Sequence, residues 1–334
     1  MSNHAIIFGG MLQVGDQFDQ YTIQAHVAQG GMSDIYRAFD LVRRREVAIK
    51  IPDQAMLGDP AQYERFQREL EIMNTLEHPA ILRGLGSGKY NRIPYLVMEF
   101  INGQSLRAML DSSGALQPEQ ALALIKKIVE GMAYCHQNNV IHRDLKPENI
   151  LITAEGQPVI MDFGLALTKG SHRVTYSNLS STMGTPDYMA PEQIEGQRGD
   201  QRTDIYSLGI MLYEMLCGET PFRGDTNMAV MAQHLNGHAP RLDRINPALS
   251  TELAAVVACC LARSPEKRFA DMGALLNALE QPETVDPSIL ENANSSNSPL
   301  ESSLLPMQTL KAIGMAVLIM LALAALALFL QSLR

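Results

Sequence analysis

The spacing of apolar positions along this chain changes near residue 100. Before that point, short runs rich in β-branched and aromatic residues predict strands. The predicted strands cover residues 21–27, 34–39, 47–51, 81–85 and 95–99. One stretch among them, residues 60–76, carries apolar residues at helical spacing and predicts a helix with one buried face.

From residue 104 onward, helical spacing dominates. Pro118 is suited to the first position of a long helix, which we expect over residues 118–137. Further helices are predicted at residues 203–216, 227–236, 251–261 and 272–279. A small β-rich part followed by a larger helical part indicates an α+β fold with two lobes, which we expect to occupy residues 17–280.

The last apolar stretch has a different character. Residues 312–330 contain no charge, and nineteen residues of helix span about 29 Å, close to the thickness of the hydrocarbon core of a bilayer. A buried helix of this length normally has one polar face, which is missing here. We therefore predict a transmembrane helix over residues 310–330, with Lys311 on the cytoplasmic side and a short non-cytoplasmic tail at 331–334.

The remaining segments are expected to flank the lobes. Residues 281–308 are enriched in Ser, Asn and Pro and carry four acids without Lys or Arg, which is typical of a solvated acidic linker. Residues 1–16 form an N-terminal extension. Their start lacks a basic region followed by a long apolar run, so no signal peptide is expected.

Composition narrows the class of protein. Apolar residues make up 46% of the chain and charged residues 19%, which is typical of a globular protein. The net charge of −9 argues against a nucleic-acid-binding surface. The cysteines lie among apolar or small residues without metal-ligand spacing, which predicts buried free thiols. They are Cys135, Cys217, Cys259 and Cys260.

The strongest chemical signal is the sequence His-Arg-Asp-Leu-Lys-Pro-Glu-Asn at residues 142–149. In it, Asp144 can hold a substrate hydroxyl, Lys146 can reach a transferred phosphate, and Asn149 can bind a metal. Thirteen residues later, Asp162 begins an Asp-Phe-Gly triplet and supplies a second metal ligand. The eight residues match the catalytic loop of eukaryotic-type protein kinases, and residues 17–280 resemble the bacterial (Hanks-type) serine/threonine protein kinases.

This resemblance implies the bilobal protein-kinase fold and phosphoryl transfer from ATP, with Mg²⁺ or alternatively Mn²⁺, to Ser or Thr of protein substrates. Lys50 matches the lysine that binds the α- and β-phosphates. Glu69 matches the carboxylate that pairs with it, with Glu64 and Glu71 as rival assignments. The other nucleotide contacts that the resemblance implies are Val27, Gly30, Gly31, Ser33, Ile35, Ala48, Met98, Glu99 and Ile101.

Two of these assignments concern particular parts of the nucleotide. Met98 matches the residue that guards the adenine site, and the backbone of residues 99–101 would read the adenine. The loop that covers the phosphates departs from the family pattern, because Ala28 and Ser33 replace two of its three glycines and only Gly30 is kept. Fewer glycines predict a stiffer clamp.

The altered loop leaves a competing interpretation open, a membrane-tethered pseudokinase scaffold. The intact Lys50, Asp144, Asn149 and Asp162 argue against it. A kinase of small molecules is a further alternative. Thr185 and the Ala-Pro-Glu sequence at 190–192 argue against that, because in the family they shape a peptide-binding surface.

The resemblance also assigns supporting roles. Glu192 would pair with Arg268, and Asp204 would brace the catalytic loop. Arg143 would bind a phosphate on the activation segment, residues 165–183. The candidate autophosphorylation sites are Thr175, Ser177, Ser180, Ser181 and Thr182.

The predicted membrane helix has consequences for location and assembly. We expect a single-pass protein of the inner membrane whose catalytic domain faces the cytoplasm. Gly314 and several alanines in this helix would permit close helix packing, so a homodimer is a hypothesis.

Overall fold

A computed structural model describes residues 12–29, 33–166 and 186–291 of the chain. The chain divides into two compact units after Leu290, and the elements described below all belong to the first. Within the described ranges, no helix is long and apolar enough to cross a membrane. The predicted membrane helix at 310–330 lies outside these ranges.

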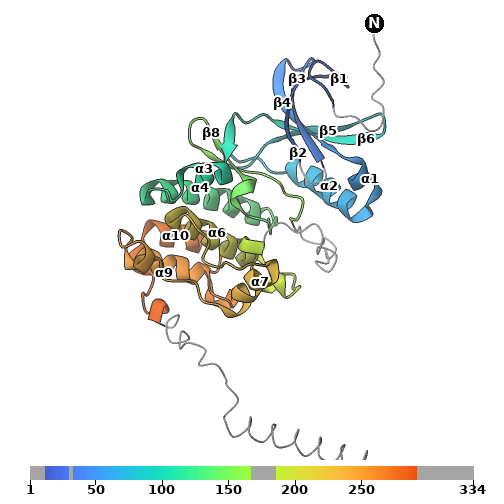
Figure 1. The fold of residues 1–334 in the computed structure, drawn as a ribbon. Helices are drawn as coiled ribbons and strands as arrows, with labels where there is room; N and C mark the ends of the chain where they lie inside the picture. The colour runs from blue at the N-terminus through green and yellow to red at the C-terminus, as the bar shows by residue number, and fades with distance from the viewer. Residues whose placement is uncertain (1–11, 30–32, 167–185, 292–334) are drawn as a thin grey trace, which may run out of the picture. The chain divides into compact units, whose positions relative to one another are not determined.

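The first part of the unit is a six-stranded antiparallel sheet in the order β1-β2-β3-β4-β6-β5 (Figure 1). Four of the five predicted strands are confirmed with small changes at their ends. The strands are β1 (Gln17–Phe18), β2 (Tyr21–Gln29), β3 (Ser33–Asp40), β4 (Arg45–Pro52), β5 (Gly84–Tyr90) and β6 (Ile93–Glu99).

The strand predicted at 81–85 is wrong in its position, because β5 begins only at Gly84. Ile81 instead forms a single parallel bridge with Ile160. The backbone of Ile160 donates to Ala80 O at 2.8 Å and accepts from Leu82 N at 2.9 Å. The apolar run is therefore buried by this long-range contact, while the strand itself starts in a glycine-rich stretch of weak β propensity.

The two faces of the sheet have different surroundings. Tyr36, Val47 and Ile49 alternate onto one face and form a separate small core. Ala48 and Met98 face the other way and join the large core that continues into the helices. Strand pleating accounts for this division, because successive side chains point to opposite faces.

Two helices follow β4, namely α1 (Gln54–Gly58) and α2 (Pro60–Met73). Asp59 caps α2 by accepting from the backbone N–H of Ala61 at 2.9 Å, and Pro60 takes the first position, where no donor is needed. The helix ends three residues before the predicted Leu76, where Thr75 donates to the carbonyl of Ile72.

The second part of the unit is helical. The long helix predicted at 118–137 is confirmed as α4, and the helices predicted at 203–216, 227–236, 251–261 and 272–279 are confirmed as α6, α7, α9 and α10. The helices are α3 (Leu106–Ser113), α4 (Pro118–Gln137), α5 (Pro191–Ile194), α6 (Gln201–Cys217), α7 (Asn227–Asn236), α8 (Leu242–Ile245), α9 (Thr251–Cys260) and α10 (Met272–Glu280).

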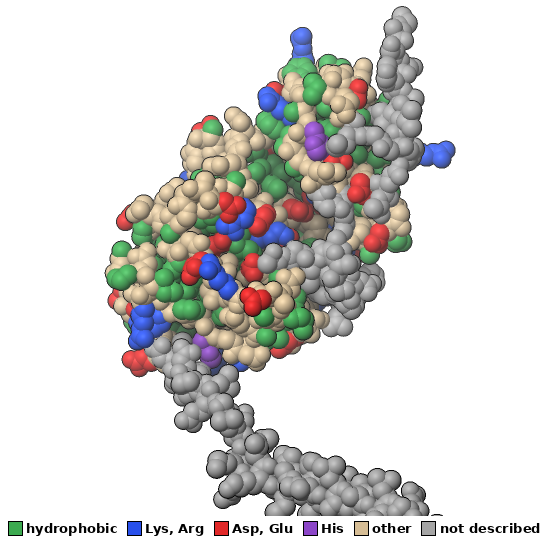
Figure 2. All heavy atoms as spheres, viewed as in Figure 1, with side chains coloured by type: hydrophobic (Ala, Val, Ile, Leu, Met, Phe, Trp, Pro, Cys, Tyr) green, Lys and Arg blue, Asp and Glu red, His purple; other side chains and the backbone are tan. Residues whose placement is uncertain are grey.

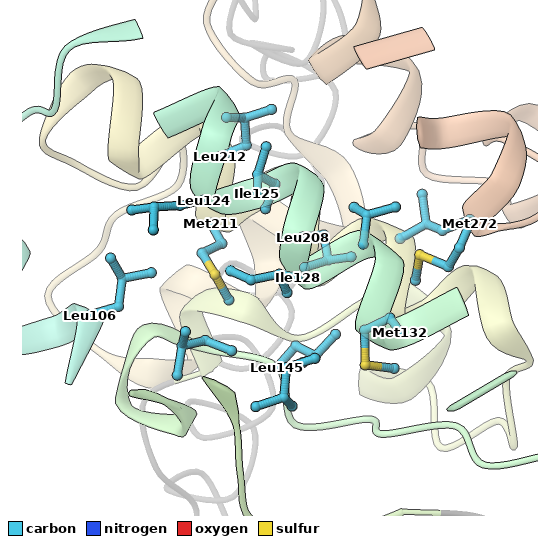
Figure 3. Close-up of a cluster of buried hydrophobic side chains, with 14 of the residues drawn as sticks. Leu106, Leu124, Ile125, Ile128, Met132, Leu145, Leu208, Met211, Leu212 and Met272 are labelled. Carbon is cyan, nitrogen blue, oxygen red and sulfur yellow. The ribbon is translucent and has the colours of Figure 1, made fainter. Parts of the chain in front are cut away.

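Helix α6 is the centre of this part. Its residues from Thr203 to Leu216 are all buried, so it has no solvent-facing side. Leu208, Met211 and Leu212 interleave with Leu124, Ile125 and Ile128 of α4 (Figure 3). At Gly209 an added Cβ would lie 2.6 Å from Cys260 Cβ, so α9 can approach α6 closely only at a glycine.

A second, three-stranded sheet was not predicted. It consists of β7 (Gly103–Ser105), β8 (Ile150–Thr153) and β9 (Pro158–Ile160), all antiparallel. Its strands are too short to show a period of two in the sequence. Strand β8 begins directly after Asn149, and β9 ends two residues before Asp162.

The packed unit continues beyond Glu280, where the linker was expected to start. Val285 and Ile289 pack on the large core, and Leu290 is only 2% exposed. These apolar residues are spaced among acids, which hides them in a segment that reads as polar.

The cysteines are free, as predicted. Burial is complete for Cys135 and Cys260 but only partial for Cys217 and Cys259, which corrects the expectation that all four thiols are buried. Cys217 and Cys259 lie at or near the ends of helices α6 and α9, where the neighbouring turns do not cover them fully.

Candidate active site

An ion pair joins the sheet to helix α2. The ammonium group of Lys50, on β4, donates to both carboxylate oxygens of Glu69 at 2.8 and 2.7 Å. Glu69 is buried, whereas Glu71 is exposed and Glu64 bonds to Arg68. The structure therefore brings Glu69, and not its two rivals, to Lys50.

A third charge stands beside this pair. Oδ1 of Asp162 lies 3.8 Å from the ammonium nitrogen of Lys50. Burial alone lowers the pKa of Lys50, but the carboxylates of Asp162 and Glu69 outweigh it and raise the pKa above its ordinary value. Lys50 in turn is the main cause that lowers the pKa of Asp162, against the opposing effect of burial. For Glu69, burial is the main cause that raises the pKa of the carboxyl group, against the lowering effect of Lys50.

The predicted catalytic residues form a second cluster. Lys146 donates to the two carboxylate oxygens of Asp144 at 3.1 and 2.9 Å. The side-chain amide of Asn149 donates to the backbone carbonyl of Asp144 at 2.7 Å and to its carboxylate at 3.1 Å. Asp144 keeps 30% of its side chain exposed, so a substrate can reach the carboxylate.

The loop is anchored in the core between these polar residues. Leu145 is 1% exposed and lies below Ile128 and Met132 of α4 in Figure 3. Because neighbouring side chains in an extended segment point to opposite sides, burying Leu145 turns Asp144 and Lys146 outward together. Acidic and basic side chains lie side by side on this face of the molecule (Figure 2).

Asp204 fixes the backbone of the loop, as predicted. Its carboxylate accepts from the backbone N–H of His142 at 2.9 Å and of Arg143 at 2.8 Å. Arg143 has a φ of 67°, which costs energy in a non-glycine residue and needs such support. His136 also lies 2.7 Å from Asp204, a contact that the sequence did not reveal because a histidine in a helix carries no distinctive spacing.

The hairpin of β8 and β9 brings Asn149 and Asp162 to the same end of the small sheet. Asn149 directly precedes β8, and Asp162 is the second residue after β9. The backbone N–H of Met161, which lies between β9 and Asp162, donates to Asn149 O at 2.9 Å. Asp162 itself has a φ of 64°. Phe163 is fully buried next to it, with its ring centroid 4.8 Å from that of His142.

These two residues fit a divalent cation. The side chain of Asp162 is 44% exposed, and no other described residue donates a hydrogen bond to the amide oxygen of Asn149. Carboxylate and amide oxygens are ligands that Mg²⁺ prefers. In the described part of the chain, no group of three His, Cys, Asp or Glu side chains could hold a metal alone. Mg²⁺ usually completes its coordination with water and with phosphate oxygens of the substrate.

The predicted adenine contacts are partly assembled. Ala48 lies directly opposite Met98 in the sheet, and both are buried. Ile35 of β3 lies opposite Lys50 of β4. Both Ile35 and Ile101 pack against the large core that contains Ala48 and Met98. The next residue pair along the sheet is Val47 opposite Glu99, the last residue of β6.

The predicted phosphate loop is less complete. Val27 is 52% exposed and sits at an irregularity in the pairing of β2 with β3, apart from the buried contacts. Ser33 is buried on β3, which does not suit the nucleotide contact that the resemblance implies for it. Gly30 and Gly31 lie outside the described residues.

Comparison with known proteins decides the family. The family described as "Protein kinase domain" matches residues 21–281. The chain belongs to the protein kinase family. The predicted family is thus confirmed, and the β-rich and helical parts are the two lobes of its catalytic domain.

Curated relatives agree with this assignment. Serine/threonine-protein kinase PknL of Mycobacterium tuberculosis is 36% identical over 265 residues, which are 78% of this chain and 66% of that protein. PknB of the same species is 38% identical over 75% of this chain and 41% of its own length, and PrkC of Bacillus subtilis is 36% identical over 75% and 38%. This chain therefore spans between about two fifths and two thirds of the relatives that it matches.

In this kinase domain, the buried ion pair predicted between Glu192 and Arg268 is present. Two guanidinium nitrogens donate to the two carboxylate oxygens, each at 2.8 Å. Thr203 adds a hydrogen bond to Glu192 at 2.8 Å, and the guanidinium lies 4.8 Å from the ring centroid of Tyr206. The pair joins α5 to the segment before α10.

Helix α6 supplies a second buried charge that the sequence did not reveal. Glu214 accepts from Arg107 of α3 at 2.8 Å and from the hydroxyl of Tyr188. Tyr188 belongs to the turn Pro186–Tyr188, which follows the activation segment of the kinase domain. Residues 167–185, including Thr185 and all five candidate autophosphorylation sites, lie outside the described residues.

Proposed function

We propose that this chain is a serine/threonine protein kinase that transfers the γ-phosphate of ATP to hydroxyl groups of proteins. One observation carries the proposal. The pair of Lys50 and Glu69, with Asp162 3.8 Å from Lys50, occurs in one structural unit with the bonded cluster of Asp144, Lys146 and Asn149. Holding a triphosphate and aligning an acceptor are the two tasks of phosphoryl transfer.

The charged residues of the site support separate roles in phosphoryl transfer. Lys50, aimed by Glu69, would hold the inner phosphates, and Asp162 with Asn149 would hold Mg²⁺, which would neutralise phosphate charge when bound. Asp144 would accept the proton of the substrate hydroxyl or orient that hydroxyl. Lys146, whose ammonium already lies beside Asp144, would stabilise charge that develops on the transferred group.

The acceptor class rests on the loop and on the relatives. Lys146 is the residue expected in this loop of Ser/Thr kinases, and the three relatives above carry serine/threonine kinase in their names. Tyr188 and Ser207 tie the turn at 186–188 to α6, since Ser207 donates to Tyr188 O at 2.8 Å. A turn fixed in this way suits the binding of a peptide rather than a small molecule.

The deciding experiment follows labelled γ-phosphate. Wild-type chain with Mg²⁺ and labelled ATP should incorporate label on Ser or Thr, whereas Asp144→Ala and Lys50→Met variants should not. Label on the wild type alone would establish the kinase. Measured ATP binding without any transfer would contradict the proposal and favour the pseudokinase scaffold, with the altered glycine loop as its basis.

We also propose regulation by autophosphorylation of the activation segment. Arg143 directly precedes Asp144 in the catalytic loop, and a phosphate paired with its guanidinium would stabilise an ordered segment next to the catalytic residue. The test replaces Thr175, Ser177, Ser180, Ser181 and Thr182 by Ala together. Undiminished kinase activity of this variant would contradict the regulation without affecting the proposed chemistry.

A membrane location is the third part of the proposal. It rests on the uncharged residues 312–330, which would place the kinase domain on the cytoplasmic face of the inner membrane. Recovery of the full chain in the membrane fraction after alkaline washing supports it, and full release contradicts it. Crosslinking in membranes tests the homodimer, for which monomers alone would be the contrary result.

A further inference from the structure

Arg37 lies on the nucleotide side of the sheet without a role in the phosphoryl transfer described above. On β3 it is opposite Ala48, two residues from the position of Ile35 opposite Lys50. Residues two apart on a strand share a face. Arg37 therefore stands on the face that carries Lys50 and Ala48, at the side of the sheet toward the lobe connection.

The guanidinium of Arg37 contacts that connection. It lies 4.7 Å from the ring centroid of Phe100, a distance typical of a cation–π interaction. Glu46, diagonally opposite on β4, holds the same guanidinium at 2.5 Å. Glu46 shares the face of Ala48, and the guanidinium of Arg37 contacts both the carboxylate of Glu46 and the ring of Phe100.

Phe100 lies in the segment that connects β6 to β7, between two residues whose backbones are held by hydrogen bonds. Glu99 before it is bonded twice to Arg83, through Glu99 N to Arg83 O at 3.1 Å and Arg83 N to the Glu99 carboxylate at 3.0 Å. Asn102 after it accepts from Ala154 N at 3.1 Å. Among the described residues, none accepts a hydrogen bond from the backbone N–H of Phe100 or Ile101.

These free groups belong to the segment expected to read adenine, so their position matters for nucleotide binding. We propose that Arg37, held by Glu46 over the ring of Phe100, is a positioning residue that fixes the backbone of residues 99–101 for the nucleotide. The inference rests on the proposed function, because it assumes that ATP binds at this face. Arg37 touches no reacting atom and acts through Phe100.

A double-mutant cycle tests the proposal on the full-length chain. Arg37→Met removes the cation and keeps an apolar stem, and Phe100→Leu removes the ring. The dissociation constant of MgATP is measured by calorimetry for the wild type, each single variant and the double variant. The initial rate of label transfer at saturating ATP is measured beside it, and thermal unfolding confirms that each variant is folded.

Each single variant should raise the dissociation constant about two- to fivefold, the effect of losing one partly exposed cation–π contact. The double variant should show no larger loss than either single one, because both remove the same contact. The rate at saturating ATP should stay within about twofold. Arg37→Lys, which keeps a cation near the ring, should restore at least half of the loss.

Arg45 offers a matched control. It is an exposed arginine on β4, one residue from Glu46 and therefore on the opposite face, and Arg45→Met should leave MgATP binding unchanged. Losses that multiply in the double variant, or an Arg37→Lys variant as weak as Arg37→Met, would overturn the proposal. A wild-type chain that binds no MgATP would instead refute the proposed function, so the two failures are distinguishable.

Discussion

The ammonium group of Lys50 lies 2.8 and 2.7 Å from the two carboxylate oxygens of Glu69, nineteen residues away on another element. An ammonium is a point charge on a flexible stem, and a buried carboxylate that accepts two bonds from it fixes its direction. The pair therefore joins the sheet and α2 and aims the cation toward Asp162.

Replacing Glu69 by Gln should lower kcat/KM for ATP about 10- to 100-fold. The amide cannot balance the buried ammonium, which would then turn toward Asp162. Steady-state kinetics with varied ATP measure the effect. Glu71→Gln, an exposed acid two residues further along the same helix, is the control and should change kcat/KM by less than about twofold. Equal effects of both variants would contradict the role of the ion pair.

Replacing Asp144 by Asn should lower the rate of label transfer by about 10²- to 10⁴-fold and leave MgATP binding within a few-fold of wild type. Asparagine keeps the size of the side chain but cannot accept a proton. Single-turnover transfer and calorimetric binding separate the two effects. A variant that transfers phosphate at the wild-type rate would exclude Asp144 as the proton acceptor.

Replacing Arg268 by Met should lower the free energy of unfolding by about 3–5 kcal/mol, because Glu192 would remain buried without its partner. Denaturant unfolding measures the change. The double variant Glu192→Gln/Arg268→Met should recover part of the loss. Arg223→Ala, which breaks a solvent-exposed pair with Glu219, should cost less than about 1 kcal/mol. Similar losses from both arginines would contradict the importance of burial.

His234 should make the stability of the domain depend on pH. It is 2% exposed on α7, with Nδ1 2.7 Å from the hydroxyl of Tyr206, and burial lowers its pKa from 6.5 to about 4. Between these values the unfolded chain binds more protons than the folded one, so stability rises with pH across this window and falls as the solution is acidified. The loss from pH 7 to pH 5 should be about 2 kcal/mol.

The variant His234→Asn tests this assignment, because Asn can accept from Tyr206 but does not titrate. In the wild type, the free energy of unfolding falls from pH 7 to pH 5. This fall should be about 2 kcal/mol smaller in the variant. His238→Asn, at an exposed position two residues after the end of α7, should keep the wild-type dependence. An unchanged pH dependence in His234→Asn would place the acid sensitivity elsewhere.

Much of the fold follows from local patterns. The helix at 118–137 was predicted with the residues at which α4 begins and ends, because Pro118 marks its start and a long amphipathic period fills it. The strand predicted at 81–85 was misplaced, because its apolar residues are buried by Ile160 and not by a sheet partner. Strands β7 to β9 were missed, since segments of three or four residues contain too few positions for a pattern.

The candidate site divides in the same way. Asp144, Lys146 and Asn149 lie within six residues, and their bonding is local, so a short motif contains it. The contacts of His136 with Asp204 and of Arg37 with Phe100 join residues more than sixty apart. No spacing rule marks such pairs, and an arginine on a strand reads as a solvated charge.

The sequence by itself determined where most of the longer strands and helices lie, the candidate residues for phosphoryl transfer and the kinase family to which they point. Residue type and short-range spacing set these properties, because backbone propensity and motif chemistry act over a few neighbouring positions. Only the tertiary structure decided that Glu69 and not Glu64 or Glu71 meets Lys50, and that Arg37 covers Phe100. The packing of whole elements sets these contacts, since it selects which face of each helix or strand is turned inward.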